Sequence, residues 1–280
     1  MRFSLSVPNF GPFADARLTA TIAREAETAG WDGVFVWDHL LGWEGNVVAD
    51  PWIVLTAVAL RTRRVRIGPM VTPLARRRPW QVVREAVTLD HLSGGRVILG
   101  VGLGSPAEED FARFGEPTDD RERAAILDEA LEIVDALLRG EVVDHDGPRF
   151  HLRGVRLDPP PVQRPRIPIW VAGSWPHRAP FRRAARYEGV IPVAAGGELV
   201  PTVEEMREVI AEVRSHRTST TAPYDHVFTG FLPDDPARAV DLLDELEALG
   251  VTWWQTSIGW PGEELEAFRD RIRRGPPGRR

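Results

Sequence analysis

Two chemically reactive residue types are missing from this chain. Its 280 residues contain no cysteine, and all 35 basic residues are arginine, so lysine is absent as well. Without cysteine there is no thiol nucleophile, no cysteine-bound zinc and no disulfide. Without lysine there is no Schiff-base aldolase, no covalently bound pyridoxal phosphate and no lysine general base. These absences exclude whole classes of covalent catalysis.

Long apolar runs and an excess of positive charge are also missing. No segment approaches the roughly 20 apolar residues that a membrane-spanning helix requires. The first residues, RFSLSVP, are typical of a strand and not of an export signal. The net charge is −6, and the basic run at residues 76–78 is too short for a nucleic-acid surface. We therefore expect a cytoplasmic protein that binds a small-molecule substrate, with no metal, no nucleic acid and no membrane.

One stretch, residues 64–104, shows how the chain is organised. A short apolar strand leads to a helix that begins at Pro79, stops at the glycines of residues 93–95 and is followed by a second apolar strand. Two parallel strands joined by a helix are predicted. Similar apolar runs predict eight strands: Phe3–Val7, Gly33–Trp37, Val65–Val71, Val97–Val101, Ile169–Ala172, Gly189–Val193, Val227–Phe231 and Trp253–Ser257.

Helical patterns separate these runs, so the chain reads as eight strand–helix pairs. This alternation predicts an α/β fold, a single (β/α)8 TIM barrel over residues 1–272. An open doubly wound sheet is the alternative. It is disfavoured because VPNFGPF, after the first strand, lacks the G-x-G-x-x-G spacing of a dinucleotide site.

Two segments fall outside the repeat. The first is an insertion of 27 residues, 142–168, between the fourth helix and the fifth strand. Asp146–Gly147 lies between two apolar pairs and predicts a hairpin turn, which we expect to be scaffold and not catalytic. The second is the basic tail, residues 273–280, which we expect to be disordered.

Candidate site residues are those that follow the predicted strands, because barrel active sites lie at the carboxyl ends of the strands. His39 shares this rim with Trp43, Trp175 and Trp260. Aromatic walls with a few polar groups suit a flat conjugated ligand. A predicted turn at Gly173 and Ser174 would offer backbone N–H groups to a phosphate.

Several segments share their order and spacing with one known family. They are AGWDGVFVWDHL (29–40), DPW (50–52), TRRVRIGPMVTPLARRRPW (62–80), TLDHLSGGRVILGVGLG (88–104), DEALEIVDALLRGE (128–141), PPPVQRPRIPIWVAGS (159–174) and AARYEGVIP (184–192). Together they resemble the bacterial-luciferase-like monooxygenase family, including its deazaflavin-dependent members. The resemblance covers nearly the whole chain.

The resemblance implies a barrel that binds reduced FMN or the deazaflavin coenzyme F420 across its mouth. It further implies a flavin- or F420-dependent oxidoreductase or monooxygenase, a homodimer and a separate flavin or F420 reductase. His39 would be the catalytic proton donor, and a non-prolyl cis peptide would lie between Pro69 and Met70. Cofactor contacts would come from Asp38, Met70, Thr72, Gly102, Leu103, Gly104, Ala172, Gly173, Ser174 and Trp175. Substrate contacts would come from Phe10, Trp43, Ser105 and Trp260.

The chain also departs from part of this family. Deazaflavin-dependent sugar-phosphate dehydrogenases carry a glutamate after the strand-4 glycine, where this chain has Ser105, and use lysines that it lacks. This disfavours their reaction and favours a small, apolar substrate. Oxygen insertion with FMN and hydride transfer with F420 both stay open. So do a flavin-binding protein without turnover and a glycoside hydrolase, which would pair Glu108 or Glu109 with Asp234 or Asp235.

Overall fold

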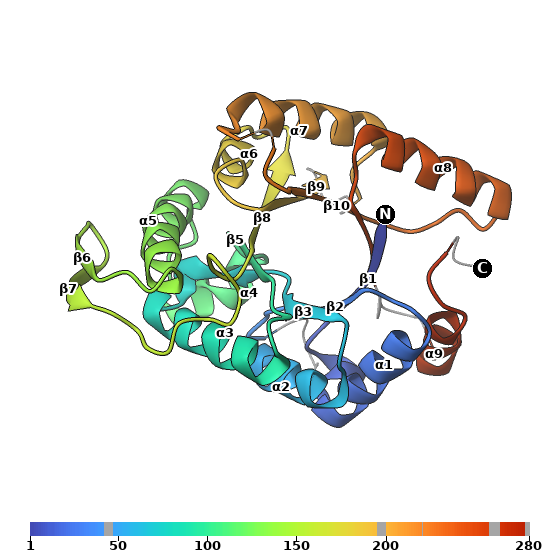
Figure 1. The fold of residues 1–280 in the computed structure, drawn as a ribbon, viewed down its shortest axis with the longest axis horizontal. Coiled ribbons are helices and arrows are strands. Elements are labelled where there is room, and N and C mark those ends of the chain that lie inside the picture. Colours follow the sequence, from blue (N-terminus) through green and yellow to red (C-terminus); the bar gives the residue numbers. More distant parts are fainter. Residues whose placement is uncertain (42–46, 195–199, 220, 258–263, 278–280) are drawn as a thin grey trace.

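A computed structural model of the chain describes residues 1–41, 47–194, 200–219, 221–257 and 264–277. Parallel strands form a ring that helices surround (Figure 1). The strands of this ring are β1 (Arg2–Val7), β2 (Gly33–Val36), β3 (Arg66–Pro69), β4 (Thr72–Pro73), β5 (Leu99–Gly102), β8 (Ile169–Trp175), β9 (Gly189–Ala194), β10 (Asp225–Gly230) and β11 (Trp253–Ser257). The predicted barrel is therefore confirmed, and each predicted strand is found close to its expected bounds.

Helices follow the strands in sequence and cover the outside of the ring. They are α1 (Ala16–Thr28), α2 (Pro51–Arg61), α3 (Pro79–Ser93), α4 (Ala107–Asp110), α5 (Asp120–Leu138), α6 (Ala179–Ala184), α7 (Val203–His216), α8 (Pro236–Leu249) and α9 (Leu265–Arg273), with short 3-10 turns at Gly11–Ala14, Leu74–Arg76 and Ala112–Phe114. Local sequence explains several helix starts. Asp15, Asp50 and Asp119 each precede a helix and accept hydrogen bonds from its first free backbone N–H groups.

The ring closes at a divided third strand. The strand order is β3-β2-β1-β11-β10-β9-β8-β5-β4, and a bridge between Ile67 of β3 and Val97, two residues before β5, closes the ring. In place of the single strand predicted over Val65–Val71, the structure has β3 and, beyond the predicted end, β4, with a non-prolyl cis peptide between them. That bond joins Met70 to Val71, so the predicted position between Pro69 and Met70 was wrong by one residue.

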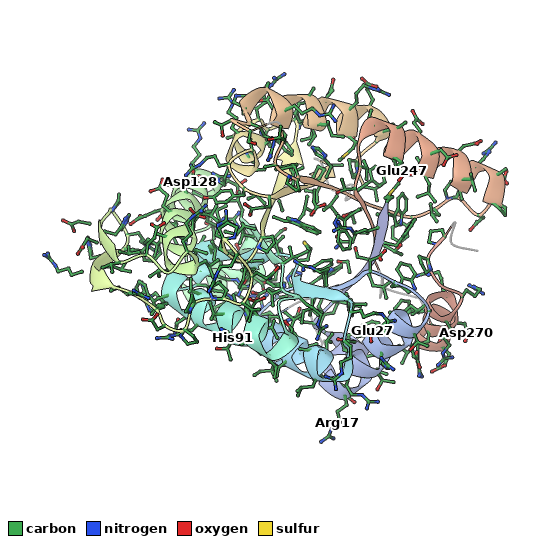
Figure 2. The ribbon with its side chains drawn as sticks, in the orientation of Figure 1. Arg17, Glu27, His91, Asp128, Glu247 and Asp270 are labelled. Atoms are coloured by element: carbon green, nitrogen blue, oxygen red, sulfur yellow. The ribbon has the colours of Figure 1, made fainter. Side chains whose placement is uncertain are left out.

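Side chains alternate between two apolar cores because successive strand residues point to opposite faces. The inner core consists of Phe35, Met70, Ile98, Trp170, Ile191, Val227 and Trp253, and the indoles of Trp170 and Trp253 lie 5.3 Å apart. Side chains occupy the space inside the ring (Figure 2). The barrel is thus filled, and a ligand has access only to its end.

A second core lies between the ring and the helices, and ion pairs join neighbouring helices over it. Asp128 of α5, labelled in Figure 2, accepts a hydrogen bond of 2.8 Å from the guanidinium of Arg183 of α6. Among the described residues, no helix has both the length and the apolar character needed to cross a bilayer.

The predicted hairpin is present in the insertion. Strands β6 (Val143–Asp146) and β7 (His151–Val155) pair antiparallel and extend away from the ring, at the left of Figure 1. Glu129 of α5 holds the tip of the hairpin, because its carboxylate accepts the backbone N–H groups of Arg149 and Phe150.

The tail differs from the expectation of disorder over residues 273–277. Arg273 is the last residue of α9, and its guanidinium lies 3.1 Å from the carboxylate of Glu25. Pro276 is buried. These contacts order the segment because they bury apolar surface and pair its charge, and residues 278–280 lie outside the described part of the chain.

Candidate active site

The loops after β1 and β2 meet at Asn9, which fixes the backbone of His39. The buried Asn9 amide donates to the carbonyl oxygens of His39 (2.8 Å) and Ala49 (2.7 Å). Its own oxygen accepts the backbone N–H of His39 at 3.2 Å. Hydrogen bonds between Asn9 and the main chain of His39 therefore fix the position of His39 at the barrel mouth, independently of its side-chain contacts.

The imidazole of His39 is paired with Asp110, the last residue of α4. Nδ1 of His39 lies 2.8 Å from one carboxylate oxygen of Asp110, and the other oxygen accepts the N–H groups of Leu40 and Leu41. Burial alone would raise the pKa of Asp110. The hydrogen bonds from His39 and Leu41 and the nearby charge of Arg76 outweigh that effect and lower it. The ionised carboxylate accepts Nδ1–H, so the neutral ring carries its lone pair on Nε2.

Aromatic rings surround this histidine. The ring centroids of Phe10 and Trp37 each lie 5.9 Å from that of His39, and the Trp37 indole N–H donates to the hydroxyl of Ser6 at 2.7 Å. The His39 side chain is 13% exposed. Phe10, predicted to contact substrate, thus lies beside His39, and both aromatic rings restrict the access of water to the imidazole.

The Asp38 side chain contacts other residues of the protein and is not exposed at the barrel mouth. Its side chain has no exposed surface and accepts hydrogen bonds from Thr72, Arg76 and Arg77. Thr72 is fully buried as well. These contacts join the loops after β2 and β3, and the cofactor contacts of Asp38 and Thr72 stay a prediction.

Hydrogen bonds from α5 fix the backbone of the glycine cluster at the end of β5. Arg123 donates to the carbonyl oxygens of Leu103 (3.3 Å) and Gly104 (2.8 Å). Gly104 has a φ of +83°, and a Cβ there would lie 2.7 Å from Pro73 Cβ. Only glycine suits this position. Gly102 is buried, Leu103 and Gly104 are half-buried, and Ser105 is exposed, so the edge of the mouth at this loop consists of backbone and a hydroxyl.

The floor of the mouth is apolar with one buried polar group. Met70 belongs to the inner core, and Ala172 packs against it. Gln255 is 2% exposed, and its amide nitrogen has no hydrogen-bond partner among the described residues. It lies two residues after Trp253 on β11, so it shares the inner face one layer nearer the mouth. An apolar floor with a buried N–H donor fits a flat conjugated ring that has carbonyl groups on its edge.

The predicted turn at Gly173 and Ser174 is wrong. Both residues lie within β8 and pair with Pro192 and Val193 of β9. A Cβ on Gly173 would lie 2.2 Å from Pro180 Cβ, so this glycine allows α6 to approach the sheet. Trp175 is buried in the outer core, 5.6 Å from the ring of Phe181. Of the three predicted contacts here, the half-buried Ser174 alone has its side chain on the inner face.

Comparison with known proteins supplies the family. A family model described as luciferase-like monooxygenase matches residues 1–274. The chain belongs to this family. An F420-dependent glucose-6-phosphate dehydrogenase from Beutenbergia cavernae is 37% identical over 81% of this chain and 68% of its own length. The 4-hydroxyprotoasukamycin monooxygenase of Streptomyces nodosus subsp. asukaensis is 35% identical over 62% of this chain and 47% of its own length.

A solved structure has the same fold over nearly the whole chain. An F420-dependent secondary alcohol dehydrogenase in complex with an F420-acetone adduct superposes with a TM-score of 0.81, covering 99% of this chain and 98% of that one. Its sequence identity is 16%, so this agreement shows the fold. The chain spans only part of several curated relatives: 62% of another F420-dependent glucose-6-phosphate dehydrogenase, from Amycolatopsis mediterranei, and 47% of the 4-hydroxyprotoasukamycin monooxygenase.

Four residues of this luciferase-like site were not among the predicted site residues: Trp37, Asp110, Arg123 and Gln255. Strand alternation was a usable signal for Trp37, because Phe35 lies on the inner face two residues earlier. Trp43 and Trp260, predicted to contact substrate, lie outside the described residues. Asp235, one candidate for a glycosidase pair, caps α8 by accepting the N–H of Ala237, and family membership argues against a hydrolase.

A substitution at Gly173 separates packing from ligand contact in this luciferase-like protein. We expect Gly173→Ala to lower the free energy of unfolding by about 1 to 3 kcal/mol, because the added methyl group overlaps Pro180. Urea denaturation measures this change. The control is Ser174→Ala on the neighbouring inner position, which we expect to stay within about 0.5 kcal/mol of the parent. Equal stability of the two variants would refute the packing role.

Proposed function

We propose that this chain is an F420-dependent oxidoreductase that interconverts an alcohol and a carbonyl group on a small, largely apolar substrate. The observation that carries the proposal is the pair formed by His39 and Asp110 at the mouth of the barrel. Such a pair moves one proton to or from a substrate oxygen. Family membership and the F420-dependent relatives support the choice of coenzyme.

The residues that would hold the coenzyme surround the apolar floor. Met70 and Ala172 would lie against the ring, and the unpartnered amide of Gln255 would donate to a ring carbonyl. The backbone of residues 102–104 and the hydroxyl of Ser174 would bind its polar parts. The coenzyme, when bound, exchanges a hydride with the substrate carbon.

The protein's own task is to manage the proton that balances this hydride. For alcohol oxidation, Nε2 of His39 accepts the hydroxyl proton, and the anionic Asp110 stabilises the resulting imidazolium. In the reverse direction the imidazolium returns that proton to the carbonyl oxygen. Phe10 and Trp37 pack beside the ring and limit exchange with bulk water.

Ser105 supports an alcohol or ketone over a sugar phosphate as the substrate. It stands where the resemblance gives the sugar-phosphate dehydrogenases an acid/base glutamate, and serine does not replace a carboxylic acid in proton transfer at neutral pH. In this chain the acid/base role falls to His39 with Asp110.

Anaerobic titration of the cofactor-free protein with F420 and with FMN tests the proposal. We expect F420 to bind at one per chain and to quench tryptophan fluorescence. Reduction of bound F420 should then follow the addition of propan-2-ol, and acetone should reverse it. Failure to bind either cofactor would overturn the proposal, and binding without turnover of any alcohol would favour a flavin-binding protein.

An FMN-dependent monooxygenase is the second candidate. It is favoured by the similarity to 4-hydroxyprotoasukamycin monooxygenase and by a mouth lined with aromatic rings. Tight binding of FMN in the same titration, with weak binding of F420, would select it. In that case a separate flavin reductase is required. With either cofactor we propose a cytoplasmic homodimer.

A further inference from the structure

A separate cavity of about 400 Å³ lies beside the loop that carries His39. Four arginines line it, Arg76, Arg77, Arg78 and Arg149, together with Gln81 and Glu116. Its walls come from distant parts of the sequence: the loop between β4 and α3, the loop before α5 and the tip of the hairpin β6–β7. Its volume is within the range of small-molecule sites.

Two of the four arginines are paired within the protein. Arg76 and Arg77 both pair with Asp38, and Arg77 also lies 3.7 Å from Glu85. Over the described ranges of the chain, Arg78 and Arg149 have no side-chain hydrogen bond or ion pair. The other acidic residue of the lining, Asp50, is used as the N-cap of α2, where it accepts the N–H groups of Trp52 and Ile53.

The backbone positions of both unpaired arginines are fixed, and the residues themselves are exposed. Arg78 is the N-cap residue of α3, and the positive end of this 15-residue helix lies at the same place. Arg149 is fixed by its main-chain N–H, 3.1 Å from the carboxylate of Glu129. The next residue, Phe150, packs against Trp80 with ring centroids 6.1 Å apart. The fold therefore brings two cations to one cavity, and no described residue pairs with their side chains.

We propose that this cavity is an oxyanion-binding site that takes the phosphate or carboxylate groups of a small polar molecule. The planar guanidinium groups of Arg78 and Arg149 match the geometry of either anion and bind it through paired N–H groups. Two uncompensated cations suit a phosphate dianion or two carboxylates. Glu116 then accepts a hydrogen bond from a hydroxyl of the same ligand.

This site is independent of the proposed oxidoreductase function, because its lining includes neither His39 nor the apolar floor. It lies close to the catalytic pair nevertheless. Leu40, in its wall, follows His39, and Arg76 lies 4.0 Å from Asp110. An anion in the cavity would therefore lie next to residues that contact the His39–Asp110 pair.

Calorimetric titration of the purified chain, without cofactor, tests the site. The probes are inorganic phosphate and citrate in chloride buffer at constant ionic strength, so that general screening is the same throughout. We expect one site per chain for at least one probe. Binding of phosphate alone would assign a phosphate ligand, and binding of citrate alone would assign a carboxylate ligand.

The double variant Arg78→Gln/Arg149→Gln should bind the probe at least about tenfold more weakly, since it loses the charge-assisted hydrogen bonds of two guanidinium groups. The matched control is Arg61→Gln/Arg153→Gln, which removes the same charge from two exposed positions outside the cavity. Loss of binding in the first variant and retention in the control would support the site. Equal binding by both variants, or no binding of either probe to the parent, would overturn it.

Discussion

Replacing His39 by alanine is expected to lower turnover by about 100-fold or more, the low end of what general acid–base catalysis contributes. The affinity for the cofactor should stay within a few-fold of the parent. His39 lies beside Phe10 and Trp37, while the inner apolar floor is built from other residues. Cofactor binding measured by fluorescence and single-turnover rates on the same preparation give the two quantities separately.

His39→Gln is the companion variant, because glutamine keeps a hydrogen-bonding group but does not titrate. It should be as slow as alanine if the imidazole transfers a proton. Turnover at the parent rate in either variant would make His39 a structural residue. Loss of cofactor binding in both would make it a cofactor ligand.

The barrel could be predicted from the sequence because each strand and helix carries its own local signal. The strands are buried on both faces, so they appear as continuous apolar runs, and the helices begin at Asp or Pro residues. The division of the third strand at Met70 had no such signal. Its position depends on how β3 and β4 pair with different neighbours, β2 and β5.

The site could be predicted only in outline. A residue after a strand lies at the mouth of the barrel, but the sequence does not say which neighbours use its side chain. Asp38 is enclosed by Arg76 and Arg77, and Gly173 faces Pro180 on the helix side. Asp110 was missed because it lies 71 residues after His39 on a helix of four residues, too short to show a periodic pattern.

The hairpin, too, could be predicted from the sequence only in part. Its turn was evident from Asp146 and Gly147, and its attachment to α5 through Glu129 agrees with a scaffold role. The same attachment places Arg149 at the arginine-lined cavity. Such a contact between an insertion and the loop before α3 depends on the closed fold and leaves no local pattern in either segment.

Asp110→Asn is expected to slow turnover by at least about 10-fold, because the carboxylate orients His39; the corresponding change in a serine-protease triad slows turnover by about 10,000-fold. Asparagine can present an N–H to Nδ1, which favours the other tautomer and removes the anion that stabilises the imidazolium. Single-turnover rates should therefore fall, while the affinity for the cofactor stays within a few-fold of the parent. A loss of stability alone would leave the single-turnover rate of the folded protein unchanged.

Stability gives a second, separable readout of the same carboxylate. The pKa of Asp110 is lower in the folded chain than its ordinary value, so its ionisation stabilises the fold above the unfolded pKa of about 4. That contribution is lost as the pH falls through the lowered folded value. The parent should be more stable than Asp110→Asn at pH 7, and urea denaturation at decreasing pH should show the difference shrinking.

The double variant His39→Ala/Asp110→Asn decides whether Asp110 acts through the histidine. If the carboxylate works by positioning and charging the imidazole, its substitution should cost nearly nothing further once the imidazole is gone, so the two effects on turnover will not add. Rates for the parent, the two single variants and the double variant complete the cycle. Additive losses would show that Asp110 acts on the reaction independently of His39, and the proton-transfer pair proposed for this barrel would then be wrong.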